Sequence, residues 1–136
     1  MTIHGWELQK TIYAALTGAS LTGAAGGAIT GVFDDVPEDT AYPYVVVGED
    51  TAINVSAKTL DIHEHTITIH TWSQYRGRKE IKVIMEQIYD TLNDASLSVS
   101  GGQLVNLKHE FETTLVEGDG ITRHGVMRFR AVVSDS

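Results

Sequence analysis

The most regular pattern of apolar and polar residues lies in the second half of the chain. Apolar residues recur there at intervals of three and four, as one buried face of an α-helix requires: Ile81, Ile84, Met85, Ile88, Tyr89 and Leu92. A similar spacing from residue 6 to residue 16 predicts an earlier helix, which ends at Gly18. Its apolar stripe consists of Leu8, Ile12, Ala15 and Leu16, and Trp6 and Tyr13 adjoin that stripe. We interpret both stripes as packing faces without chemistry.

Alternation with a period of two predicts strands elsewhere. Three valines at residues 45–47 follow Pro43, as expected of a strand that begins just past a proline. In residues 63–73 the odd positions form one face, and the C-terminal third predicts two strands whose apolar residues are also odd. These residues are Val105, Leu107, Phe111, Leu115, Met127, Phe129, Ala131 and Val133. The helix at 81–92 should therefore contact Leu107, Phe111, Met127 and Phe129.

The two C-terminal strands are joined by the segment from residue 117 to residue 122, and parity predicts their register. A slip of one residue would bury charged side chains, so odd residues should pair with odd ones. A three-residue turn from Gly118 to Gly120 satisfies this condition. It places Glu110 opposite Arg128, which is favourable. It also places Lys108 opposite Arg130, which is unfavourable unless Glu110 relieves the repulsion.

These elements predict an α+β fold, with an antiparallel β-sheet of about four to five strands and two helices packed on one face. A chain of 136 residues has the size of one domain, so we expect residues 1–136 to form a single domain. Residues 18–31 are mostly Gly, Ala, Ser and Thr. They are too small to pack a core and predict a flexible loop.

Composition excludes several classes of protein. A net charge of −8 argues against tight nucleic-acid binding, because that affinity comes mainly from Lys and Arg at phosphates. The absence of cysteine excludes disulfides and thiolate metal sites. No apolar run approaches the roughly 20 residues that span a bilayer, and no signal for secretion is recognisable at the N-terminus. The sequence predicts a soluble chain without a membrane partner.

The charges are unevenly distributed. No basic residue lies between Lys10 and Lys58, whereas four of the ten basic residues lie within seven positions. Such blocks are either a solvated surface or a surface for head-to-tail association of like subunits. As candidate interface residues we name a basic block, Arg76, Arg78, Lys79 and Lys82, and an acidic block, Asp34, Asp35, Glu38 and Asp39. Cations at the start of a helix are disfavoured by its dipole, so a neighbour's carboxylates would compensate them.

Histidines at 63, 65 and 70 raise the question of a metal site, since imidazole is a common zinc ligand. Strand alternation separates them: His63 and His65 share a face about 6.6 Å apart, and His70 faces the other side. His109 and His124 could add a ligand, but neither lies in a metal-binding motif. We expect no structural or catalytic metal. An enzyme that binds a metal through His63 and His65 stays an alternative.

Other catalytic motifs are absent from the sequence. It contains no glycine-rich phosphate loop, no Gly-x-Ser-x-Gly elbow and no His-Glu-x-x-His. A Ser73 nucleophile with a histidine base can be imagined in almost any chain of this size. We therefore expect no catalytic residues and no cofactor.

Three segments carry a resemblance to a known family. They are "VFDDVPEDTAYPYVVVGEDT" (32–51), "HTITIHTWSQYRGRKEIKVIMEQIYDTLND" (65–94) and "TRHGVMRFRA" (122–131). In this order they resemble the tail terminator, or tail completion, proteins of long-tailed bacteriophages and gene transfer agents. Each motif alone is modest, but the ordered set is fairly specific.

The resemblance implies a structural virion protein rather than an enzyme. It implies a hexameric ring at the head-proximal end of the tail, assembled in the host cytoplasm, with the tail tube protein and a head-neck protein as partners. The ring would stop tube polymerisation and join the tube to the neck. A hexamer would carry roughly −48, six times the charge of one chain, so DNA would pass through its channel without specific binding. Another neck protein, a stopper or adaptor, is the alternative.

Overall fold

The computed structural model describes residues 3–135 and contains five strands and two helices in that range. In chain order they are α1 (Gly5–Gly18), β1 (Val32–Phe33), β2 (Tyr44–Asn54), β3 (Ile62–Ser73), α2 (Lys79–Leu92), β4 (Gln103–Val116) and β5 (Arg123–Ser134). The strands form one sheet in the order β1-β2-β3-β5-β4. All neighbours are antiparallel except the short β1, which runs parallel to β2.

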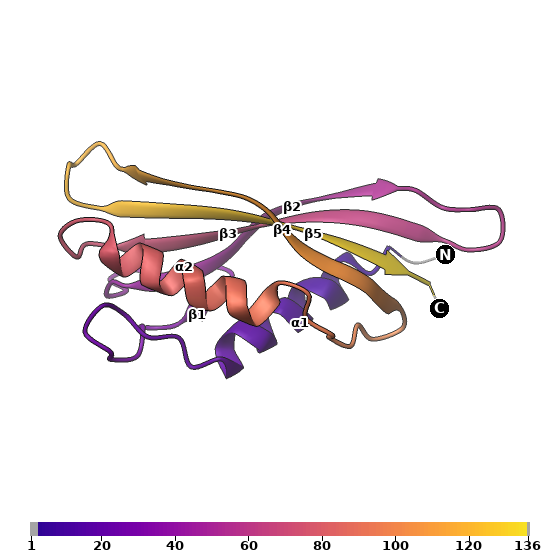
Figure 1. Cartoon of the computed structure of the whole chain (residues 1–136), viewed down its shortest axis with the longest axis horizontal. Helices are drawn as coiled ribbons and strands as arrows, with labels where there is room; N and C mark the ends of the chain where they lie inside the picture. Colours follow the sequence, from indigo (N-terminus) through magenta and orange to yellow (C-terminus); the bar gives the residue numbers. More distant parts are fainter. Residues whose placement is uncertain (1–2, 136) are drawn as a thin grey trace.

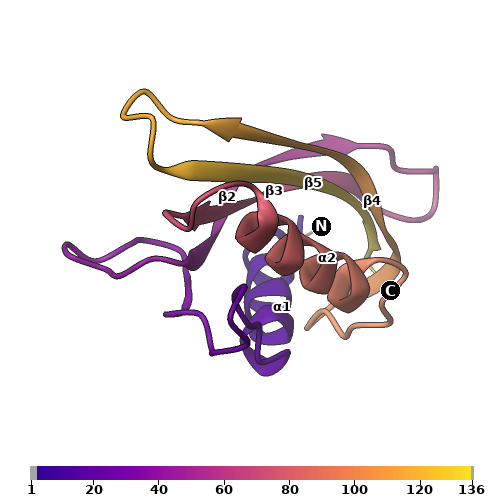
Figure 2. The same ribbon diagram turned by 60° about the vertical axis from the view of Figure 1, so that its left-hand side comes forward.

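Both helices lie on the same face of this sheet, and no helix of the described part covers the opposite, open face (Figures 1 and 2). The predicted α+β fold is therefore confirmed. Neither helix is long and apolar enough to cross a membrane.

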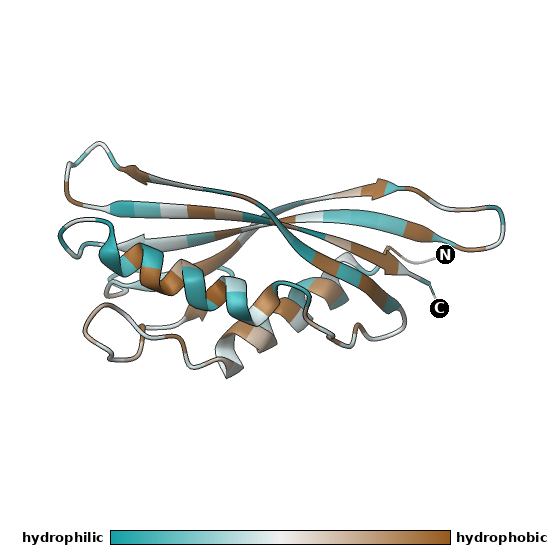
Figure 3. Cartoon of the chain, in the orientation of Figure 1, coloured by the Kyte–Doolittle hydropathy of each residue, from teal (hydrophilic) through white to brown (hydrophobic). Residues whose placement is uncertain are grey.

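The core lies between the helices and the odd-numbered residues of β3 and β5, as parity predicted. Every odd residue of β3 is buried and every even one is partly exposed. In β5 the core residues are Met127, Phe129, Ala131 and Val133. Figure 3 shows apolar residues recurring as bands along α2, and the apolar residues Ile81, Ile84, Met85, Ile88 and Leu92 of this helix are buried. Gly125 lets α2 approach closely, because a Cβ there would lie 2.5 Å from the sulfur of Met85. Tyr89, predicted in the packing stripe, is exposed instead.

Strand β4 departs from the predicted pattern at two β-bulges. The predicted register holds only in the middle of the strand, where Leu107 pairs with Ala131 and Lys108 with Arg130. A bulge at each end of this section inserts one residue and reverses the alternation. The prediction that four odd residues of β4 face the core is therefore wrong for three of them: Val105, Phe111 and Leu115 are exposed.

The second bulge also changes the predicted charge pairs. Phe111, not Glu110, pairs with Arg128 in the ladder, although Arg128 Nε still lies 3.1 Å from Glu110 Oε1. The predicted repulsion between Lys108 and Arg130 is relieved by two other carboxylates. Lys108 forms an ion pair with Asp94, and Arg130 lies 3.1 Å from Glu64.

The β4–β5 turn is one residue longer than predicted. Four residues, 118–121, lie between Glu117 and Thr122, whose backbones are joined by a 2.8 Å hydrogen bond. Gly120 takes the left-handed conformation with φ 72°. Asp119 accepts hydrogen bonds from the Ile121 and Thr122 amides and from the Thr122 hydroxyl, which hold its pKa at about 2. The longer turn agrees with the one-residue shift of register.

The loop from residue 18 to residue 31 contributes to the core, contrary to the expectation from its composition. Leu21 is 3% exposed and belongs to the core cluster. Gln87 of α2 accepts a hydrogen bond from the Thr22 amide at 3.0 Å and donates one to the Thr22 carbonyl at 2.8 Å. These contacts hold one side of the loop against α2, while its mobility stays a prediction.

Candidate assembly surfaces

The predicted interface residues are all exposed. The basic block surrounds the start of α2, where Arg78 is the N-cap residue without a side-chain capping bond. The acidic block follows β1 directly. Within residues 3–135 no ion pair involves either block, so the structure does not bring the two blocks together in one chain. Their predicted contact would have to form between chains.

Glu80 lies next to the basic block but has a different role. Its carboxylate is 8% exposed and accepts hydrogen bonds from the Ser73 hydroxyl at 2.7 Å and from the Ala24 amide at 3.0 Å. It thereby joins the end of β3, the start of α2 and the 18–31 loop. No motif in the sequence marks Glu80 as a residue with this role. The available signal was an acidic residue in the first turn of a helix, where the dipole favours it.

Among the described residues, no histidine is bonded to Ser73, the imagined nucleophile. Its hydroxyl donates to Glu80 and accepts a 3.0 Å hydrogen bond from the Tyr75 amide. The side chain is buried, with 1% exposure. These bonds give Ser73 a structural role at the end of β3.

His63 and His65 lie on the helix side of the sheet, as alternation predicted. Their ring centroids are 6.4 Å apart, and Nε2 of His65 donates a 3.1 Å hydrogen bond to the Ile3 carbonyl. Burial lowers the pKa of His65. Within the described range, no three His, Cys, Asp or Glu side chains are grouped so as to hold a metal ion. The expected absence of metal stays a prediction for elemental analysis.

His70 lies on the open face, where it meets His124 of the adjacent strand. His70 Nδ1 and His124 Nε2 are 2.7 Å apart. The outer nitrogens reach carboxylates: His70 Nε2 lies 2.6 Å from Glu49, and His124 Nδ1 lies 3.1 Å from Glu117. The indole of Trp72 stacks on His124 with ring centroids 3.8 Å apart. A row of hydrogen-bonded side chains thus connects β2, β3, β5 and the β4–β5 turn: Glu49, His70, His124 and Glu117.

The contact between the facing nitrogens needs one hydrogen between them. One ring nitrogen donates this hydrogen and the other accepts it, because two N–H groups set against each other would repel. Consistently, burial and the charge of His70 lower the pKa of His124, and the hydrogen bond from His70 lowers the pKa of Glu49.

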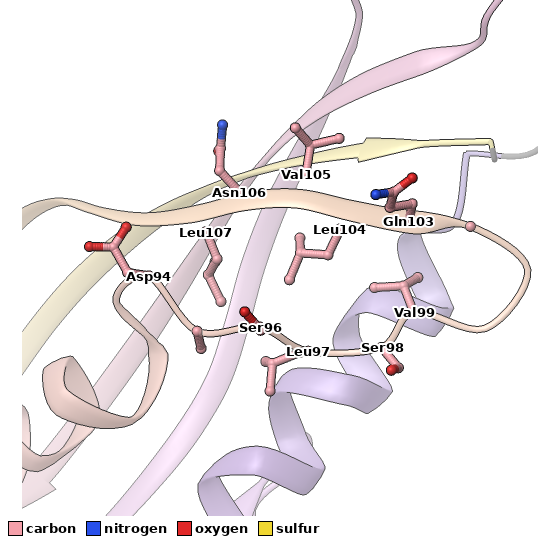
Figure 4. Close-up of a pocket in the computed structure, with 12 residues that line it drawn as sticks. Asp94, Ser96, Leu97, Ser98, Val99, Gln103, Leu104, Val105, Asn106 and Leu107 are labelled. Carbon is pink, nitrogen blue, oxygen red and sulfur yellow. The ribbon is translucent and has the colours of Figure 1, made fainter.

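A hollow of about 390 Å³ lies between β4 and the segment that connects α2 to it. Leu104 and Leu107 point into it from the strand, and Leu97 and Val99 lie on the opposite wall (Figure 4). Asp94 is the only titratable residue among its lining residues, and it forms an ion pair with Lys108. The hollow therefore contains no pair of groups for acid–base catalysis.

Comparison with known proteins gives a consistent result. The model of the family described as tail completion protein gp17 matches residues 10–134. The tail completion protein gp17 of Bacillus phage SPP1 is 25% identical over 99 residues, which are 73% of each chain. Among solved structures, a chain in the virion of a native gene transfer agent particle matches with a TM-score of 0.80 and 26% identity. That match covers 93% of this chain and 94% of the other.

Proposed function

Because the chain belongs to the tail completion protein gp17 family, it is a structural protein of a virion tail, and we propose that six copies form a ring at the head-proximal end of the tail tube. In this proposal the chain acts as one domain in each subunit. The observation that carries the proposal is the likeness to a virion chain over nearly the full length of both chains.

The proposed mechanism is geometric. Subunits joined head to tail use two different surfaces, so a contact with the correct rotation closes into a ring. One face of the ring repeats the surface to which tube subunits add, and the opposite face fails to recruit another tube subunit. Polymerisation stops at that face, which instead binds a neck protein of the head.

The net charge supports free passage of DNA through the ring. Six chains carry roughly −48 in total. An acidic channel repels phosphates and supplies few cations to displace their counterions. DNA therefore meets no affinity that would hold it in the channel.

We assign the subunit contact to the two charged blocks, with the basic block of one copy against the acidic block of the next. Support comes from their exposure and from the lack of an ion-pair partner for any of the eight side chains in residues 3–135. Arginine–carboxylate pairs with two hydrogen bonds would also fix the angle between subunits.

Light scattering on the purified protein tests both parts of the proposal. The wild-type mass should correspond to six chains, and negative-stain images should show rings.

Changing Arg76 and Arg78 to Glu should raise the protein concentration needed for assembly, whereas changing both to Lys should raise it much less. Added salt should weaken the wild-type ring if the pairs are partly exposed. Rings of the Glu variant at unchanged concentration would show that these blocks do not hold the ring together.

A further inference from the structure

Helix α1 has apolar side chains on two sides. Leu8, Ile12 and Leu16 are buried in the core, whereas Trp6 and Tyr13 are 62% and 41% exposed. A helix that covers one core normally carries polar residues on its outer side. The outer apolar residues of α1 therefore call for a partner outside the core.

The exposed side of α1 forms a groove together with β1. This groove has a volume of about 640 Å³ and is lined by Trp6, Gln9, Lys10, Tyr13, Ala14, Val32, Phe33, Asp34 and Asp35. Lys10 lies over the Trp6 ring and is paired with Glu7 at 3.1 Å. Asp34 and Asp35 have no ion-pair partner within residues 3–135. The groove thus suits an apolar segment that carries a positive charge.

The same chain carries such a segment in the β2–β3 hairpin. Residues 51–61, which we term the arm, extend beyond the helices at one end of the sheet (Figure 1). Ile53 and Val55 of the arm are 55% and 47% exposed. Lys58 lies at its tip, exposed and without an ion-pair partner in the described part of the chain.

The arm is held in shape by its own hydrogen bonds. The Val55 amide donates to the Ile62 carbonyl at 2.9 Å, and the Ala57 amide donates to the Leu60 carbonyl at 3.0 Å. The Ser56 hydroxyl also accepts a 2.9 Å hydrogen bond from the Ile62 amide. A preformed hairpin loses little conformational entropy when it binds. Because it points away from the helical layer, it is placed to meet another molecule rather than its own groove.

We propose that the arm of one copy lies in the α1–β1 groove of the next copy. Ile53 and Val55 contact the apolar side chains of the groove, and Lys58 faces Asp34 and Asp35. A second copy is the occupant because the arm matches the groove in both apolar character and charge. Arm and groove are different surfaces, so each copy offers one of each and the contact propagates head to tail.

This inference rests on the proposed ring but differs from the charged-block contact. It gives Asp34 and Asp35 a partner in Lys58, and leaves Glu38 and Asp39 of the acidic block for the basic block. It also gives the ring a buried apolar centre, which is what usually supplies affinity in an interface. Charge at the rim mainly sets register and the rate of association.

Thiol cross-linking tests the contact, because the chain has no cysteine of its own. The double variant Val55→Cys, Tyr13→Cys is treated with a short bis-maleimide and separated on a denaturing gel. We expect a ladder of cross-linked species up to the hexamer. The control is Val55→Cys with Glu86→Cys, because Glu86 is exposed on α2 outside the groove. The control should remain monomeric on the gel.

Light scattering on the uncross-linked samples separates the possible failures. Hexamers in solution without cross-links between positions 55 and 13 would overturn the arm contact and leave the ring intact. A ladder that stops at the dimer would overturn the head-to-tail arrangement. If the wild-type protein is monomeric at every concentration tested, the proposed ring itself fails and the arm contact fails with it.

Discussion

Two histidines whose burial disfavours the charged form make the stability of this protein depend on pH. Burial lowers the pKa of His124, and it also lowers that of His65 in the core. Both folded-state pKa values therefore lie below the usual value of about 6.5, which applies to the unfolded chain. At a pH between the folded-state and the unfolded-state pKa of either histidine, the unfolded chain binds more protons than the folded chain. Acid therefore favours unfolding.

We predict that the free energy of unfolding falls as the pH decreases through the range just below 6.5. Urea denaturation at a series of pH values between about 7.5 and 5 measures this dependence. The variant His124→Gln should show a weaker dependence, because one of the two histidines is removed. A free energy of unfolding that stays constant or rises on acidification would contradict the lowered pKa values of His65 and His124 in the folded protein.

Two phenylalanines provide a test of the sheet faces. Phe129 is fully buried, whereas Phe111 is 44% exposed beside Arg128. Changing Phe129 to Ala should destabilise the fold by about 3 to 5 kcal/mol. The same change at Phe111 should cost much less, because part of that ring already lies in water. Equal losses in denaturant unfolding would show that the bulge at Glu110 is misplaced.

The histidines also predict the metal content of the protein. His63 and His65 lie on one face of β3, and His70 lies on the other, bonded to His124 and Glu49. We predict that protein purified without a histidine tag contains no stoichiometric metal. Elemental analysis measures this directly. Bound zinc that is lost in the His63→Ala, His65→Ala variant would support the alternative of a metal-dependent enzyme.

For single residues of β3, the sequence predicted the face of the sheet that each side chain occupies. It did not predict which side chains of other strands they contact. Alternation alone separates His70 from His63 and His65. The contact of His70 with His124 depends on β3 lying next to β5, and these strands are distant in sequence. No local pattern specifies such a pairing, so the histidine pair became recognisable only in the folded sheet.

Among the elements, the 18–31 loop has a divided character. Leu21, Thr22 and Ala24 are held by the core, Gln87 and Glu80, respectively. We predict that the amides of residues 25, 27 and 28 exchange with solvent within seconds, whereas the Thr22 amide, bonded to Gln87, exchanges much more slowly. Hydrogen exchange of the free protein measures both. Slow exchange over all of residues 18–31 would show that the loop is not flexible.

A substitution in α2 adds a matched control to that experiment. Glu80→Gln keeps the size of the side chain and still offers an oxygen to Ala24, so the loop should keep much of its protection. Glu80→Ala removes the acceptor for both Ala24 and Ser73, and leaves polar groups unpaired. Exchange near Ala24 should therefore accelerate more in the Ala variant than in the Gln variant.

The elements differ in how far the sequence predicted them. Helices α1 and α2 and strand β3 each present one face to the core and follow their hydrophobic periods there. The exceptions are Tyr89 in α2 and Trp6 and Tyr13 in α1, which are exposed. Strand β4 lies at the edge of the sheet, where two bulges are tolerated and the alternation reverses twice. Simple parity therefore placed Phe111 and Leu115 on the wrong face.

For the whole molecule, ordered motifs in the sequence indicate the family, whereas the proposed ring depends on surfaces that have no partner within residues 3–135. The charged blocks were visible in the sequence as runs of like charge. The arm and the α1–β1 groove were not, because the groove brings together residues 6–14 and 32–35 and the arm is defined by its projection from the sheet. Only the fold shows that both surfaces are exposed in one chain.

The proposed ring ends tube growth, so the length of the tail tubes measures its action. The tail tube protein of the same virion is allowed to polymerise with increasing amounts of this protein, and tube lengths are measured in negative-stain images. Tubes should become shorter as rings are added and should carry extra density at one end. Tubes of unchanged length in the presence of excess rings would contradict this action, and would place the ring elsewhere in the neck.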